Sequence, residues 1–96
     1  MNIKKSLSGT EVTIMLEGRL DTMTAPELEK ELKENYDSIT GLVLDFKDLE
    51  YISSAGLRVL LSAHKALNGK LVVKNVIDTV MEVFEITGFA DILTIE

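Results

Sequence analysis

Two adjacent serines are the residues best placed to do chemistry. Ser53 and Ser54 follow an apolar, strand-like segment and precede a helix-like segment. The first backbone N–H groups of a helix lack intrahelical partners and form its positive end, so this place favours an anion. A phosphate on one of the hydroxyls would add about −1.5 to −2 charges there. The alternative is an ordinary cap, in which the Ser54 hydroxyl satisfies a free N–H of the helix.

The helix after the serines carries further polar residues at a spacing that puts them on one face. Arg58 lies four residues after Ser54, and Ser62 lies eight residues after it. Residues four apart are neighbours on a helix surface, so Arg58 could reach a phosphate on Ser54. A solvated surface arginine is the alternative interpretation.

Composition narrows the classes of function. The chain has 96 residues, enough for one domain, and its net charge of −6 disfavours nucleic acid and anionic membranes as partners. Cysteine is absent and His64 is the single histidine, which argues against disulfides, thiol catalysis and a zinc site. We expect no metal and no cofactor. No apolar run approaches membrane-spanning length and no signal peptide is visible, so we expect a cytoplasmic protein with a protein partner.

Hydrophobic periodicity predicts the elements that must position the serines. A period of two over residues 12–16 predicts a strand, and residues 2–7 could pair with it as a hairpin. Thr24 and Glu27 fit a capping box, with Pro26 in the first turn, and predict a helix over residues 25–36. A second helix is expected over residues 54–67, with Asn68-Gly69 as its stop signal.

Continuous apolar runs predict the remaining strands. Residues 42–44 and 71–73 are typical of strands buried on both faces of a parallel sheet. The first of these strands is expected to reach residue 46, with residues 47–52 as a connection from it to the serines. A third helix should follow Asn75 and end near Thr87-Gly88, and residues 92–95 should form the last strand. The expected fold class is α/β, a single domain with a mixed central sheet covered mainly by helices in the order β-β-α-β-α-β-α-β.

Three short motifs resemble the STAS domain family, specifically the bacterial anti-sigma factor antagonists. They occur in the family's order and are Gly18-Arg19-Leu20-Asp21, Ile52-Ser53-Ser54-Ala55-Gly56-Leu57 and Phe84-Glu85-Ile86-Thr87-Gly88-Phe89. The resemblance covers the whole chain and implies one STAS domain over residues 1–96.

The resemblance implies a phosphorylation-controlled partner switch in bacterial signalling and transcription regulation. Ser54 takes the position of the phosphorylated serine, with Ser53 as the second candidate. In the family the unphosphorylated protein binds an anti-sigma factor with GHKL-type serine kinase activity and thereby frees a sigma factor, and a PP2C-type phosphatase restores this form. The family pattern is often D-S-S/T-G-L, in which Ser53 here replaces the aspartate and Ala55 replaces the second hydroxyl residue.

The same resemblance, taken with the helix face described above, predicts the partner-binding residues. They are Asp21, Thr22, Ser53, Ser54, Gly56, Leu57 and Arg58. Asp21 matches an aspartate that in the family lies near the acceptor serine on the kinase-facing surface. On residue type alone, a turn or capping aspartate is an equal alternative.

Two other functions compete with the switch. An enzyme lacks support, because the chain has no G-x-S-x-G elbow, no glycine-rich phosphate loop and no thiol, and Ser54 and His64 would lie about 15 Å apart along one helix. We therefore expect a binding protein and not an enzyme. A STAS docking subunit or regulator of a transporter or lipid-transport complex, working without phosphorylation, remains open because the family aspartate is missing at Ser53.

Overall fold

The computed structural model describes residues 1–34 and 39–96, and its elements follow the expected order with one added 3₁₀ turn. The strands are β1 (Asn2–Ser8), β2 (Glu11–Leu20), β3 (Gly41–Ile52), β4 (Leu71–Lys74) and β5 (Thr94–Ile95). The helices are α1 (Ala25–Lys33), α2 (Ser54–Ala66), α3 (Asp78–Thr87) and the 3₁₀ turn η1 (Phe89–Asp91). The expected end of the first helix at Tyr36 lies outside the described residues.

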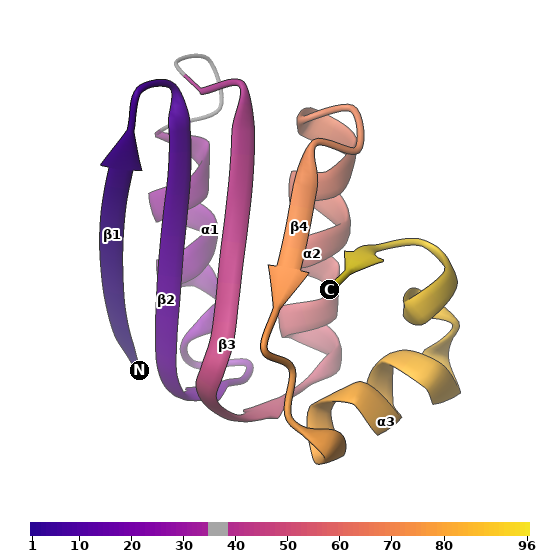
Figure 1. Cartoon of the computed structure of the whole chain (residues 1–96). Coiled ribbons are helices and arrows are strands. Elements are labelled where there is room, and N and C mark those ends of the chain that lie inside the picture. The colour runs from indigo at the N-terminus through magenta and orange to yellow at the C-terminus, as the bar shows by residue number, and fades with distance from the viewer. Residues whose placement is uncertain (35–38) are drawn as a thin grey trace.

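The five strands form one mixed sheet whose spatial order equals the chain order. β1 is antiparallel to β2, and β2 to β5 are parallel to one another. Each new parallel strand is added on the same side, and right-handed crossovers then bring the connecting helices to the same face of the sheet. Figure 1 shows α1 and α2 side by side behind the sheet, and α3 beyond the carboxyl end of β4.

The core lies between the helices and one face of the sheet. On β3, Leu42, Leu44 and Phe46 are buried, whereas the alternate residues Val43 and Asp45 are only partly buried. The prediction that this strand is buried on both faces is therefore wrong. The physical reason is that α1 and α2 lie on the same face of the sheet, and no element of residues 1–34 and 39–96 covers the other face of β3.

The segment before the serines is strand and not a separate connection. β3 continues from Phe46 to Ile52 and stays paired with β2, with irregular register near Glu17 and Arg19. Leu49 and Ile52 are buried, which anchors this extension to the core. The expected loop over residues 47–52 is corrected accordingly, and the serines follow directly from a paired strand.

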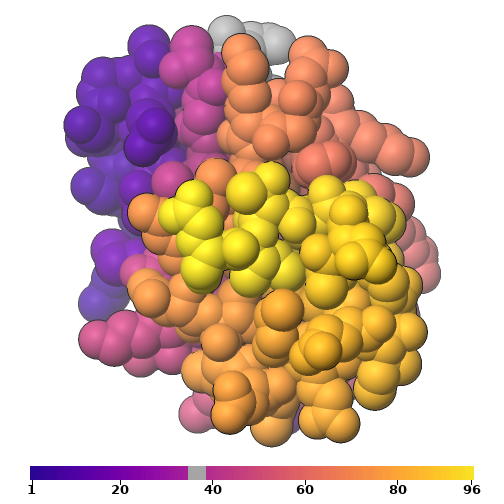
Figure 2. Space-filling view, turned by 45° about the vertical axis from the view of Figure 1, so that its right-hand side comes forward, coloured from indigo at the N-terminus to yellow at the C-terminus, as the bar shows by residue number. Residues whose placement is uncertain are grey.

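Helix ends agree with the expectations only in part. Pro26 lies in the first turn of α1, and Gly88 ends α3 in the left-handed conformation with φ of 83°. Thr24 is the N-cap of α1, but its hydroxyl does not cap the helix, so the expected capping box is absent. The segment from α3 to β5 forms one continuous part of the surface in Figure 2. Two large apolar residues of this segment, Ile86 and Ile92, are exposed.

Candidate functional site

The two serines have different structural roles at the start of α2. Ser53 is the N-cap, and its Oγ accepts a long hydrogen bond of 3.5 Å from the Gly56 N–H. The Ser53 N–H donates to the Leu20 carbonyl at 2.9 Å, which ties the helix start to the end of β2. Ser54 is the first residue of the helix and is exposed. The cap is thus Ser53, and the Ser54 hydroxyl is left on the surface.

The positive end of α2 is not neutralised by its own residues. Within the described part of the chain, the N–H groups of Ser54 and Ala55 donate no hydrogen bond, and the first turn of α2 contains no acidic residue. Free N–H groups and an uncompensated helix dipole favour an anion. The start of α2 is therefore chemically suited to a phosphate on the neighbouring hydroxyl.

Gly56 lets α2 approach the sheet closely. A Cβ added at Gly56 would lie 2.7 Å from Leu20 Cγ and 2.9 Å from Ile52 Cγ1, closer than packed atoms allow. Gly56 and Leu57 are both buried. Their contact with a partner stays a prediction, and in this structure both residues lie beneath the exposed surface at the start of α2.

The loop between β2 and α1 is held together by Asp21. The Asp21 Oδ1 accepts hydrogen bonds from the N–H groups of Met23 at 3.0 Å and Thr24 at 3.2 Å, and Arg19 Nε lies 3.8 Å from Oδ2. The Thr24 hydroxyl donates to the Arg19 carbonyl at 2.8 Å and accepts from the Asp21 N–H at 2.9 Å, so it closes the loop instead of capping α1. Asp21 therefore acts as a turn residue beside the serines.

These contacts set the ionisation of Asp21. Partial burial acts to raise the pKa of this carboxyl group, but the hydrogen bonds from Thr24 and Met23 and the charge of Arg19 together lower it below the ordinary value of 3.8. Each of these partners favours the charged carboxylate. Asp21 is thus ionised at neutral pH, next to the cationic side chain of Arg19.

Arg19 and Met23 belong to this region although the sequence did not single them out. The guanidinium carbon of Arg19 lies 4.2 Å from the centre of the Tyr51 ring, a cation–π contact across the paired ends of β2 and β3. Met23 is 86% exposed, more than any other large apolar residue in the described part of the chain. The sequence signal for Met23 is a large apolar side chain among the polar residues of a loop. The contact between Arg19 and Tyr51 depends on the register of β2 against β3, which the sequence does not reveal.

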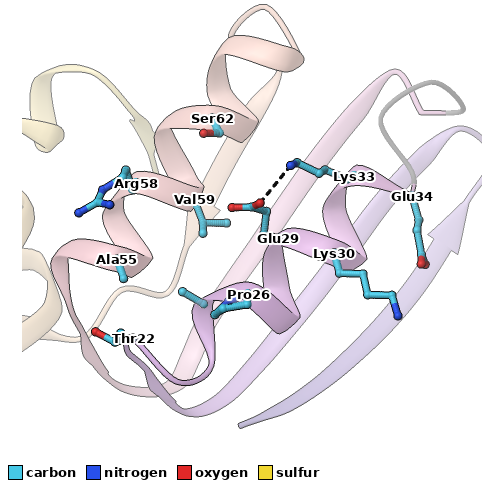
Figure 3. Close-up of a pocket in the computed structure, with 11 residues that line it drawn as sticks. Thr22, Pro26, Glu29, Lys30, Lys33, Glu34, Ala55, Arg58, Val59 and Ser62 are labelled. Atoms are coloured by element: carbon cyan, nitrogen blue, oxygen red, sulfur yellow. Dashed lines mark ion pairs between the residues drawn. The ribbon is translucent and has the colours of Figure 1, made fainter.

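A groove runs between α1 and α2 and reaches the serine end of α2. It has a volume of about 580 Å³ and includes Thr22 and Ala55 at that end. Buried Ala25 and Val59 belong to its apolar floor. Figure 3 shows Val59 and Glu29 pointing toward one another from the two helices, while Arg58 points outward from α2.

The residues expected from the sequence therefore fall into connected groups. Asp21 and Ser53 are linked through Leu20, whose carbonyl accepts the Ser53 N–H and which pairs with Ile52 across the sheet. Thr22 and Arg58 are exposed and both line the groove.

In the described ranges, no helix combines the length and apolar character needed to cross a membrane.

Comparisons with known proteins agree with this fold. A relative from Listeria monocytogenes, named anti-sigma-B factor antagonist, is 36% identical over 100% of this chain and 90% of its own length. The structure of the anti-sigma factor antagonist SpoIIAA in its unphosphorylated form has a TM-score of 0.79 at 18% identity, covering 99% of this chain and 87% of that one. The phosphorylated form of Bacillus SpoIIAA has a TM-score of 0.78 at 19% identity, covering 99% and 91%. The family model described as the STAS domain matches residues 2–96, and the chain therefore belongs to the STAS domain family.

Proposed function

We propose that this protein is an anti-sigma factor antagonist whose binding is switched by phosphorylation of Ser54. The unphosphorylated form binds an anti-sigma factor that has GHKL-type serine kinase activity, and this binding releases a sigma factor. A PP2C-type phosphatase returns the phosphorylated form to the binding state. The name of the Listeria relative supports the role as antagonist.

The observation that carries the proposal is the difference between the two serines. Ser53 is half-buried and engaged as the N-cap of α2, whereas Ser54 is exposed at the first helical position. A kinase needs a hydroxyl that it can reach, and the free N–H groups of Ser54 and Ala55 can stabilise the phosphate afterwards. Both requirements favour Ser54 as the acceptor.

The same geometry explains how a switch can act without unfolding the domain. A phosphate at Ser54 adds about −1.5 to −2 charges to an exposed helix start that is electrostatically suited to an anion. The fold should persist, while the bulk and charge of the surface around Thr22 and Arg58 change. A partner that docks on this surface would then lose affinity through steric and electrostatic conflict.

The decisive experiment is phosphate mapping by mass spectrometry after incubation with the cognate anti-sigma kinase and ATP. Wild type and Ser53→Ala should carry one phosphate on Ser54, and Ser54→Ala should carry none. In binding assays Ser54→Ala should bind the anti-sigma factor whether or not ATP is present, and Ser54→Asp should bind more weakly.

The contrary outcome is equally clear. If an active kinase leaves Ser54 unmodified and the Ala and Asp variants bind alike, the phosphorylation switch is wrong. The docking role without phosphorylation, as a subunit or regulator of a transporter or lipid-transport complex, would then be the better description.

A further inference from the structure

The groove between α1 and α2 is not explained by phosphate chemistry at Ser54. Its floor includes the buried side chains of Ala25 and Val59, and its serine end is formed by Thr22 and Ala55. The volume of about 580 Å³ is sufficient for one or two large side chains of another molecule. The groove is continuous with the proposed partner surface, because Ala55 follows Ser54 directly in α2.

The charges along the groove indicate what kind of group it accepts. Glu29 and Lys33 form an ion pair with each other at 3.0 Å on the α1 side, as Figure 3 shows. Arg58, on the α2 side near the serines, is exposed and forms no ion pair or hydrogen bond with the residues that the structure describes. In a protein with a net charge of −6, this unpaired guanidinium is complementary to a carboxylate on a partner.

From this geometry we infer that the groove receives an apolar side chain of the anti-sigma factor, and that an adjacent carboxylate of that partner pairs with Arg58. Phosphorylation of Ser54 weakens this contact by drawing Arg58 onto the phosphate. The inference rests on the proposed function and adds the place, the chemistry and the mechanism of release. Ser54 and Arg58 are four residues apart on one helix, so a phosphate and a partner carboxylate compete for the same guanidinium.

Two substitutions on α2 test whether the partner docks in the groove and on Arg58, with Lys65 as the matched control position. Lys65 is exposed on the same helix and does not line the groove. Ser62→Trp should fill the groove from its exposed rim and weaken anti-sigma binding about tenfold, whereas Lys65→Trp should leave the affinity unchanged. Arg58→Gln should weaken binding about tenfold or more, because it removes a charge-assisted hydrogen bond, and Lys65→Gln should not. Isothermal titration calorimetry gives these affinities, and circular dichroism checks that each variant is folded.

The competition between the Ser54 phosphate and the partner carboxylate for Arg58 is tested by a separate measurement. Phosphorylation should shift the Arg58 side-chain Nε–H resonance in ¹⁵N NMR spectra, and it should reduce anti-sigma affinity by a larger factor in wild type than in Arg58→Gln. An unshifted resonance and equal factors in the two proteins would overturn the competition.

The outcomes separate this inference from the proposed function. Strong binding by wild type, together with equal affinities of Ser62→Trp and Lys65→Trp, would overturn docking in the groove and leave the antagonist role intact. If wild type does not bind the anti-sigma factor at all, the proposed function fails first, and the inference fails with it.

Discussion

Gly56→Ala is the sharpest test of how α2 is seated on the sheet. The added Cβ would lie 2.7 Å from Leu20 Cγ, 2.9 Å from Ile52 Cγ1 and 3.1 Å from Leu20 Cδ2. Leu20 is fully buried and Ile52 is 3% exposed, so neither side chain can swing into solvent. The helix start must therefore shift away from the end of β2, which also strains the hydrogen bond from Ser53 N–H to the Leu20 carbonyl.

Two opposing contributions set the size of the effect. Inserting a methyl group into a well-packed core costs about 1–3 kcal/mol. Replacing glycine by alanine inside a helix returns about 0.8–1.0 kcal/mol through helix propensity. We expect a net loss of about 1 kcal/mol in the free energy of unfolding, equivalent to about 4–8 °C in Tm for a domain of this size.

Urea denaturation followed by circular dichroism measures this loss. Ser62→Ala is the matched control, because Ser62 is exposed on the same helix and its replacement should change stability by less than about 0.5 kcal/mol. In a Leu20→Ala background, two of the three close contacts disappear, and Gly56→Ala should cost less than in wild type. A Gly56→Ala protein as stable as wild type, or more stable, would refute the close-approach argument.

Three further expectations follow from the loop and the helix start. Ser53→Ala should lower the free energy of unfolding by about 0.5 kcal/mol, the low end for a cap because its bond is long, whereas Ser54→Ala should be nearly neutral in a urea titration. Asp21→Ala should destabilise the protein at neutral pH. Because the pKa of Asp21 is lowered in the folded protein, the difference in unfolding free energy between wild type and variant should persist above about pH 4 and shrink as the pH falls through the folded pKa. A difference that does not depend on pH would contradict the Asp21 contacts. A double-mutant cycle of Arg19→Ala and Tyr51→Leu should give a coupling of about 0.5–1 kcal/mol, and additive effects would show that the cation–π contact contributes nothing measurable.

The order of elements and the position of the serines could be predicted because they depend on local signals. Alternating apolar residues marked β2, and Pro26 and Gly88 marked the start of α1 and the end of α3, since each acts on its own stretch of backbone. The expected capping role of Thr24 is wrong because its hydroxyl bonds instead to the Arg19 carbonyl and the Asp21 N–H. Such a choice between two local partners is decided by the loop geometry.

The functional surface depended more on tertiary structure. Residue type offered Ser54 as a cap, whereas in the structure Ser53 is the N-cap, its N–H bonded to Leu20 of a separate strand, and Ser54 is exposed. The burial of Gly56 against Leu20 has the same origin. Neither contact is visible in a local pattern, because the partners are more than thirty residues apart in the chain.

The sequence by itself determined the α/β order, the helix start with two serines, and the family of the domain, because hydrophobic period and short motifs are properties of neighbouring residues. Only the tertiary structure decided that α1 and α2 lie on the same face of the sheet, leaving Val43 partly exposed, and that these two helices leave a groove ending at Thr22 and Ala55. The physical reason is that the direction of each crossover and the distance between two helices follow from packing across the sheet, which no single segment encodes.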